Sequence, residues 1–155
     1  MTVALMVRAR QAMTSESNKV VLGRHFNEVL NQGKLQVVDE IYTSDYVLDA
    51  PIQSDGSSQV RGLTQGREQL KQRVVSFRTA FPDLHFTMDE VIVEWDTVVV
   101  RYTYRGTHQG KFAGAQPSHR PISISGILIA HLTNGKIREA WSAFDSAELM
   151  RQISL

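Results

Sequence analysis

The residues best suited to chemistry lie near the C-terminus, in the stretch NGKIREAWSAFDSAELMRQI and in the segment just before it. Asp145 ends one segment of alternating apolar and polar residues, and His131 lies at the end of the preceding one. A carboxylate and an imidazole on neighbouring strands can exchange protons with a ligand as general acid and base. Glu139 would add a second carboxylate, and Trp141 a flat apolar wall.

Whether these side chains share a face depends on the turn between the two strands. A two-residue turn at Asn134-Gly135 would point His131 away from the side of Asp145. A three-residue turn that begins at Thr133 and carries a glycine bulge would place all four side chains on one face. Thr-Asn-Gly suits a type I turn followed by a left-handed glycine, so we favour the bulged turn.

Asp145 also has a purely structural explanation. Asp145-Ser146-Ala147-Glu148 has the spacing of a capping box before the short amphipathic helix SAELMRQI. A capping aspartate accepts backbone N–H bonds, which lower its pKa and make it a poor base. On spacing alone the cap is favoured. The other three residues have structural alternatives as well. His131 can be a packed or hydrogen-bonded histidine, Glu139 a solvated carboxylate and Trp141 a core residue.

Apolar residues at helical spacing predict three helices in the first half of the chain. The first begins with Ser17 as its N-cap and ends at Gly33, a shorter one follows in KLQVVDEIY, and the third ends at Pro82. Phe26 and Phe77 lie on the apolar faces of the first and third helices, and we expect them to contact a substrate.

Between the second and third helices, DYVLDAPIQ predicts a short strand that Pro51 stops, and the polar residues 53–62 predict a surface loop or a lid. After Pro82 the period becomes alternating, which predicts a meander of four strands with turns at Asp96 and Asn134-Gly135. The order of elements indicates an α+β fold, in which the helices pack in the concave face of a strongly curved, mostly antiparallel sheet. A cleft at that face is the expected ligand site.

The bulk composition excludes several classes of function. The chain has 155 residues, is 42% hydrophobic and 21% charged, and has a net charge of +1 and no cysteine. We expect a flexible extension at 1–14, a single domain at 15–155, a cytoplasmic location, no nucleic-acid partner and no membrane span. The five histidines lack the spacing of a metal motif and no phosphate-binding loop is present, so we expect no metal and no cofactor.

Three stretches carry a resemblance to a known family: FPD at 81–83, RYTYRGTHQGKFAG at 101–114, and NGKIREAWSAFDSAELMRQI at 134–153. With the order of elements, they make the chain similar to the SnoaL-like polyketide cyclases, within the nuclear-transport-factor-like superfamily of cone-shaped α+β folds. The resemblance runs from about Asn18 to Ile153. It implies a cofactor-independent aldol cyclisation of a polyketide ester.

The resemblance also implies roles for individual residues. Family cyclases carry their acid/base aspartate at the end of the last strand and a histidine one strand earlier, which assigns these roles to Asp145 and His131. Many relatives have His-x-Pro on the first strand, where this chain has Asp49-Ala50-Pro51. Asp49 would therefore add a carboxylate to the mouth or base of the pocket, and at this position the resemblance does not extend to the substrate of the antibiotic cyclases.

Two alternatives to the cyclase remain open. One is an isomerase, dehydratase or epoxide hydrolase of the same fold. The other is a non-catalytic protein that binds a small apolar molecule. We also expect a homodimer or a higher homo-oligomer formed through the outer face of the sheet. In the bulged register that face would carry Ile124, Leu128, Ala130 and Phe144.

Overall fold

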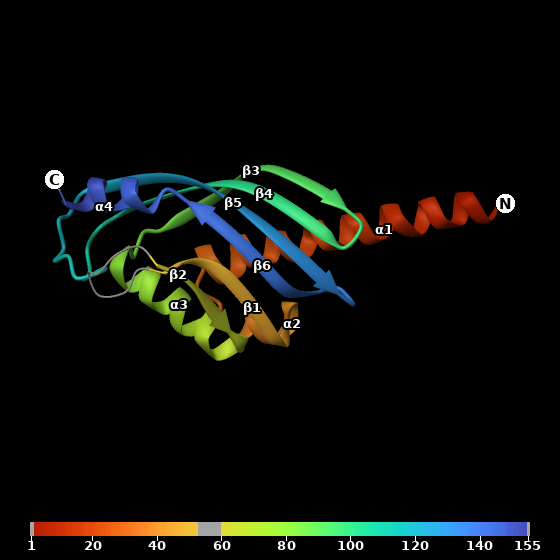
Figure 1. The fold of residues 1–155 in the computed structure, drawn as a ribbon, viewed down its shortest axis with the longest axis horizontal. Helices are drawn as coiled ribbons and strands as arrows, with labels where there is room; N and C mark the ends of the chain where they lie inside the picture. Colours follow the sequence, from red (N-terminus) through yellow and green to blue (C-terminus); the bar gives the residue numbers. More distant parts are fainter. Residues whose placement is uncertain (1, 53–59, 155) are drawn as a thin grey trace.

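The computed structural model describes residues 2–52 and 60–154, and Figure 1 shows a curved sheet with helices on one side of it. The helices are α1 (Val3–Arg24), η1 (His25–Asn31), α2 (Gln36–Ile41), α3 (Gly66–Ala80) and α4 (Ser146–Ser154). The strands are β1 (Tyr42–Ile52), β2 (Val60–Gln65), β3 (His85–Glu94), β4 (Thr97–Thr107), β5 (Pro121–Thr133) and β6 (Lys136–Phe144). The predicted α+β class is confirmed.

The sheet has the strand order β2-β1-β6-β5-β4-β3. Strands β3 to β6 form the predicted antiparallel meander, and the β1–β2 hairpin joins its β6 edge through a parallel pairing of β1 with β6. Burial in β5 alternates without interruption, so that every second residue from Ile122 to Leu132 faces the interior. Helix α3 and the end of the α1–η1 helix cover this inner face.

The first helix begins earlier than its apolar pattern indicates. Helix α1 starts at Val3, so the predicted start near Ser17 is wrong. No proline or glycine interrupts residues 3–22, and this composition permits a continuous helix. Figure 1 shows the first half of α1 extending beyond the sheet. The division into an extension at 1–14 and a domain at 15–155 stays a prediction.

Strand β1 is longer than expected and includes Pro51, so the predicted stop at this proline is wrong. Pro51 lies opposite Arg61 of β2, whereas the pairing of β1 with β6 ends at Asp49 opposite Trp141. Beyond Asp49 the strand has a neighbour on one side only, where a missing N–H is tolerated. Of the predicted loop at 53–62, residues 53–59 lie outside the described residues, and the last three belong to β2.

In the described part of the chain, no helix combines the length and the apolar content that crossing a bilayer requires.

Candidate functional site

The hairpin that carries most of the predicted site has a two-residue turn. Asn134 and Gly135 both have positive φ, at 50° and 73°, and Thr133 pairs directly with Lys136. The predicted three-residue turn is therefore wrong. Asn-Gly is the pair of residues that best tolerates positive φ at two successive positions. This explains why the chain forms the two-residue turn and not the bulged one.

A β-bulge in the strand after the turn changes which side chains face inward. Leu132 pairs with Ile137 and His131 with Glu139, so Arg138 is an extra residue between the two pairs. Arg138 and Glu139 are both exposed, and the buried positions after them are Ala140 and Ser142. The alternation that starts at Ile137 is thus reversed along β6.

The four predicted site residues of this hairpin therefore do not point into the interior. His131 lies opposite Glu139, and Trp141 follows on the same face, but this is the outer face of the sheet, where Trp141 is 41% exposed. Asp145 is exposed just after β6. The expected inward orientation is wrong for all four. For Glu139, Trp141 and Asp145 the reason is the bulge, which reverses the side of β6 that faces the core. For His131 the reason is the regular alternation of β5, which turns Ala130 and Leu132 inward.

Asp49 lies on the outer face as well. It pairs with Trp141, while its neighbours Leu48 and Ala50 are buried and point inward. The expected carboxylate at the mouth or base of the pocket is therefore wrong in its placement. The residues expected on the outer face are in turn found inside: Ile124, Leu128 and Ala130 are buried, and Phe144 lines a cavity.

Asp145 forms the cap that its spacing predicts. Its Oδ1 accepts a hydrogen bond from the backbone N–H of Glu148 at 2.9 Å, while the Glu148 carboxylate binds Arg151 and Gln152 instead of completing the capping box. His131 Nδ1 lies 3.1 Å from Thr97 Oγ1 on the exposed surface. An acid/base role for Asp145 and His131 stays a prediction that their positions do not favour.

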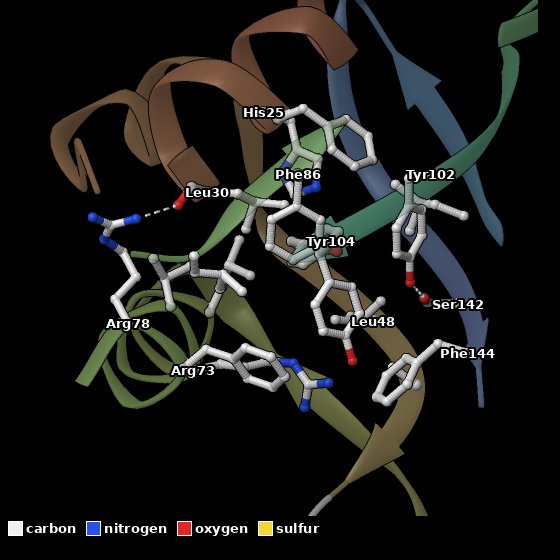
Figure 2. A pocket seen from close by; sticks show the side chains of 18 residues that line it. His25, Leu30, Leu48, Arg73, Arg78, Phe86, Tyr102, Tyr104, Ser142 and Phe144 are labelled. Atoms are coloured by element: carbon white, nitrogen blue, oxygen red, sulfur yellow. Dashed lines mark hydrogen bonds between the residues drawn. The ribbon is translucent and has the colours of Figure 1, made fainter. Parts of the chain in front are cut away.

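A cavity of about 100 Å³ lies between the inner face of the sheet and the helices α3 and η1 (Figure 2). Its walls are mainly apolar and aromatic, and they include Phe26 and Phe77, as the sequence predicts. The lining contains no Asp or Glu among the described residues. The polar side chains of the lining are instead His25, Tyr46, Arg73, Arg78, Tyr102, Tyr104 and Ser142.

Arg73 and Tyr104 form the most polar part of this cavity. Figure 2 shows the Arg73 guanidinium and the Tyr104 hydroxyl turned toward each other, and the two groups interact electrostatically. Burial lowers the pKa of Arg73, while Tyr46, Tyr102 and Tyr104 act in the opposite direction. Burial raises the pKa of Tyr104 well above its ordinary value, so its hydroxyl stays protonated. This hydroxyl is buried and has no hydrogen-bond partner among the described residues.

A pair of hydroxyl groups lies on the sheet side of the cavity. Tyr102 Oη and Ser142 Oγ are 3.0 Å apart. Gly126 makes this pair possible, because a Cβ at that position would lie only 2.5 Å from the Tyr102 hydroxyl. Ser142 and Leu128 are the residues that β6 and β5 turn toward the cavity near this point. Neither is ionisable, so these strands supply no acid/base pair to the interior here.

His25 brings an imidazole to the helix side of the cavity. It is 8% exposed, and its Nδ1 forms a short hydrogen bond with the hydroxyl of the fully buried Tyr42. Burial lowers the pKa of His25 to about 4, so the ring is neutral near pH 7. Its edge-on contacts with Phe26 and Tyr42 complete an aromatic environment.

The sequence contains signals for several of these residues. Arg73 lies three residues after Leu70 and four before Phe77, which places a charged side chain on the apolar face of a helix. Tyr102 and Tyr104 continue the buried alternation of Val98 and Val100. Ser142 had no such signal, since its orientation depends on the bulge at Arg138.

Within the described residues, no group of three or more His, Asp or Glu side chains lies close enough together to hold a metal ion.

Comparison with known proteins identifies the fold family. The family model of the SnoaL-like polyketide cyclases matches residues 20–153. No curated protein matches the chain. Among solved structures, a proposed SnoaL-like polyketide cyclase from Jannaschia sp. CCS1 superposes with a TM-score of 0.80 at 24% identity, over 91% of this chain and 94% of that one.

Two further structures are similar over most of their length. IdmH of Streptomyces antibioticus, a proposed polyketide cyclase, has a TM-score of 0.75 and 24% identity over 89% of this chain and 99% of its own. AclR of Streptomyces galilaeus, a proposed hydroxylase, has a TM-score of 0.73 and 22% identity over 90% of this chain and 82% of its own. The match of the family model over residues 20–153 shows that the chain belongs to the SnoaL-like polyketide cyclase family.

Proposed function

We propose that this protein is a cofactor-independent enzyme that acts on a small, mostly apolar carbonyl compound and stabilises negative charge on its oxygen. Aldol cyclisation of a polyketide-like compound is the reaction that family membership favours. The observation that carries the proposal is the Tyr104 hydroxyl, buried beside Arg73 without a partner among the described residues. Both groups can donate hydrogen bonds to an oxygen that enters the cavity.

The chemistry of the cavity fits a reaction through an enolate. Removing a proton from a carbon between two carbonyls, with a hydroxide ion from the solvent as the acceptor, releases water and places negative charge on the carbonyl oxygens. Preorganised donors in a site that excludes water stabilise such charge far better than water does. Arg73 supplies a positive charge and Tyr104 a neutral hydroxyl. The proposal assigns charge stabilisation to these two residues.

The size of the cavity favours a small ligand. An enclosed cavity of about 150 Å³ accepts benzene. The cavity here measures about 100 Å³ and opens to the surface, so part of a ligand with one ring can extend out of it. A compound with one ring therefore fits the observed side-chain positions better than a compound with several rings. This supports a small ketone, diketone or β-keto ester as the first substrates to test.

The proposal is tested by deuterium exchange at the acidic carbon of benzoylacetone and ethyl benzoylacetate, followed by NMR. We expect Tyr104→Phe to reduce the protein-catalysed rate roughly 10- to 100-fold, and Arg73→Met to reduce it at least as much. Arg105→Met, on the exposed surface of β4, is the matched control and should keep the full rate. Full activity of both pocket variants would refute the assignment.

A second candidate function is binding without catalysis. The specific observation in its favour is that Ser142 and Leu128, not an aspartate and a histidine, face the cavity from β6 and β5. A binding protein would take up benzoylacetone without accelerating exchange. Isomerase, dehydratase and epoxide-hydrolase activities also develop charge on an oxygen, and the corresponding substrates belong in the same set of assays.

A further inference from the structure

A π-helical segment delivers His25 to the cavity. Helix α1 is α-helical up to Arg24, and the next seven residues, His25–Asn31, form the π-helix η1. Hydrogen bonds in a π-helix join residues five apart. Such segments are rare in proteins, and those that occur are often found at functional sites. His25 and Leu30, five residues apart, both line the cavity, together with Phe26. The unusual helix therefore lies where the ligand would bind.

The partner of His25 determines which ring nitrogen carries the proton. The only hydrogen bond of the Tyr42 hydroxyl among the described residues is with His25 Nδ1. If Nδ1 carried the proton and donated it, the hydroxyl proton of the fully buried Tyr42 would have no acceptor, which is costly. If Tyr42 donates to Nδ1 instead, its hydroxyl is satisfied. The proton of the neutral ring then resides on Nε2.

The second nitrogen of His25 is left for the ligand. Nε2 makes no hydrogen bond with the described residues, and it is not among their fully buried unsatisfied atoms. His25 lines the cavity, so a ligand there contacts this residue, and Nε2 is the ring nitrogen that has no hydrogen-bond partner among the described residues. Figure 2 shows His25 on the helix side and Arg73 at the other end of the group of lining residues.

We propose that His25 binds a ligand oxygen through a neutral Nε2–H donor, which Tyr42 holds in that tautomer. This rests on the proposed function, because it makes His25 a second oxygen-binding point opposite Arg73 and Tyr104. A ligand oxygen can then be bound at either end of the apolar cavity, and a ligand with oxygens at both ends of an apolar body would occupy both binding points. A neutral imidazole of this kind polarises a carbonyl without the cost of burying a second positive charge.

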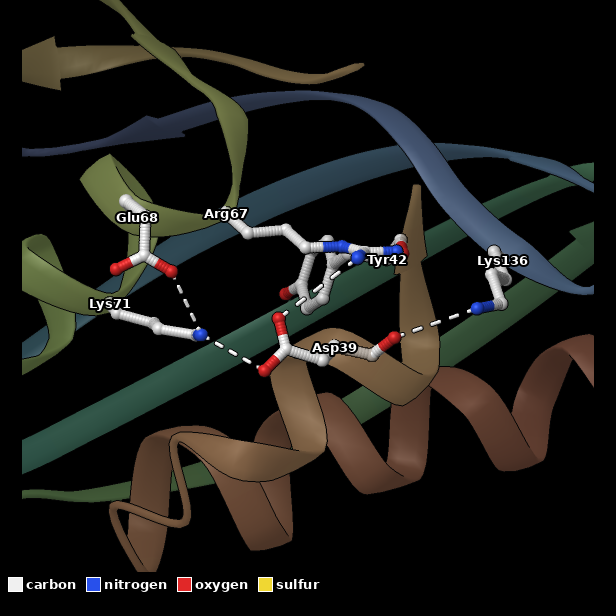
Figure 3. A network of polar contacts seen from close by, with 6 residues as sticks. All are labelled: Asp39, Tyr42, Arg67, Glu68, Lys71 and Lys136. Carbon is white, nitrogen blue, oxygen red and sulfur yellow. Dashed lines mark hydrogen bonds and ion pairs between the residues drawn. The ribbon is translucent and has the colours of Figure 1, made fainter. Parts of the chain in front are cut away.

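Helix α3 contacts both ends of the cavity. Arg67, in its first turn, donates to the backbone carbonyl oxygen of Tyr42 from Nε at 3.1 Å and from Nη2 at 2.5 Å (Figure 3). Lys71, on the same helix, binds Asp39 of α2 at 2.9 Å. Arg73, six residues after Arg67, is the cation of the cavity. One helix therefore positions both Tyr42, which orients His25, and Arg73.

The tautomer is tested by NMR of the whole protein with ¹⁵N-labelled histidine. We expect His25 to show a protonated Nε2 and an unprotonated, hydrogen-bonded Nδ1 at pH 7. Adding benzoylacetone, which has two oxygens and one ring, should shift the Nε2 resonance and leave that of the exposed His131 unchanged. A proton on Nδ1 in the free protein, or no binding of benzoylacetone at millimolar concentration, would overturn the proposal.

Variants separate this role from a structural one. His25→Gln keeps a donor near the position of Nε2, whereas His25→Met removes it, and we expect roughly tenfold weaker binding of benzoylacetone to the Met variant than to the Gln variant. Tyr42→Phe should move part of the His25 population to the other tautomer in the same NMR experiment. Equal affinity of the Gln and Met variants would refute the donor role.

The proposed function can fail independently. If benzoylacetone binds and shifts the Nε2 resonance of His25 but no exchange is catalysed, the donor assignment stands and the enzymatic function fails. If exchange is catalysed and depends on Arg73 while His25→Met changes neither binding nor rate, the function stands and the His25 proposal fails.

Discussion

The carboxylate of Asp145 accepts the backbone N–H of Glu148 at 2.9 Å, and this bond fixes the start of α4. The bond therefore occupies the carboxylate that family resemblance makes the strongest acid/base candidate. Asp145 lies on the side of the sheet away from the cavity. It also predicts what a substitution of Asp145 should do.

We expect Asp145→Ala to lower the free energy of unfolding by about 1 kcal/mol, because the helix loses its N-terminal cap. Asp145→Asn should cost less, since asparagine also caps helices. Denaturant unfolding measures both effects. Neither variant should change the exchange rate of benzoylacetone. Loss of turnover in a folded Asp145→Asn protein would contradict this prediction and support Asp145 as the acid/base after all.

Gly126→Ala should separate the hydroxyl pair on the sheet side of the cavity. Its new Cβ would lie 2.5 Å from the Tyr102 hydroxyl and 2.8 Å from the carbonyl oxygen of Ala143. Overpacking of this kind costs about 1–3 kcal/mol. Gly23→Ala is the control, because it adds a methyl group in a helix with nothing within 4 Å and should stabilise by up to about 1 kcal/mol. Equal stability of the two variants would show that Tyr102 moves freely.

The buried His25 predicts a loss of stability in mild acid. Its pKa is about 4 in the folded protein against an ordinary 6.5, so the unfolded chain takes up the proton first as the pH falls. The contribution of the neutral His25 to the free energy of unfolding is fully present above pH 6.5 and declines toward pH 4. About 2 kcal/mol of it is lost at pH 5.

Urea unfolding at pH 7 and pH 5 measures this loss. His25→Gln should show a smaller difference between the two conditions, and the remaining difference includes the contribution of the buried His108, whose pKa burial also lowers. Carboxylates interfere little in this window. The pKa of Glu148, for example, is lowered to about 2 by its hydrogen bonds with Arg151 and Gln152, and its contribution declines only below the ordinary value of 4.5. Equal losses in the wild type and the variant would show that His25 is not buried as a neutral ring.

The homodimer stays a prediction, but the residues that would form its interface differ from those expected from the sequence. On the outer face, Ile92, Val99, Ile129 and Trp141 lie side by side on β3, β4, β5 and β6 through their strand pairings. Ile92 and Trp141 are 58% and 41% exposed. If this row pairs with a second copy, Trp141→Glu should convert a dimer to a monomer in analytical ultracentrifugation. Thr133→Glu, at the exposed end of β5, should not. A monomeric wild type at micromolar concentration would refute the dimer.

Periodicity and turn residues predicted most of the fold, because these signals are local. The helix around Phe26, the helix around Phe77 and the four-strand meander appear as expected. The orientation of β6 could not be obtained in this way. It depends on the extra residue Arg138, and neither the composition nor the alternation of that strand marks a bulge.

The candidate site could be predicted only in part for the same reason. Phe26 and Phe77 lie in the cavity because helical spacing fixes their direction. Arg73 is recognisable in the sequence as a charge on an apolar helix face, but helical spacing alone does not mark it as part of a site. The pairing of His25 with Tyr42 joins residues 17 positions apart through a π-helix, which residue spacing alone does not indicate.

The bulge at Arg138 also affects how related chains should be aligned. A relative whose last strand lacks the extra residue has one residue fewer between the Asn-Gly turn and the position of Ser142. Counting from the turn would then match an outward side chain in one protein with an inward side chain in the other. Aligning from the start of α4 backward, with a one-residue gap at Arg138, assigns each residue of β6 to the correct face.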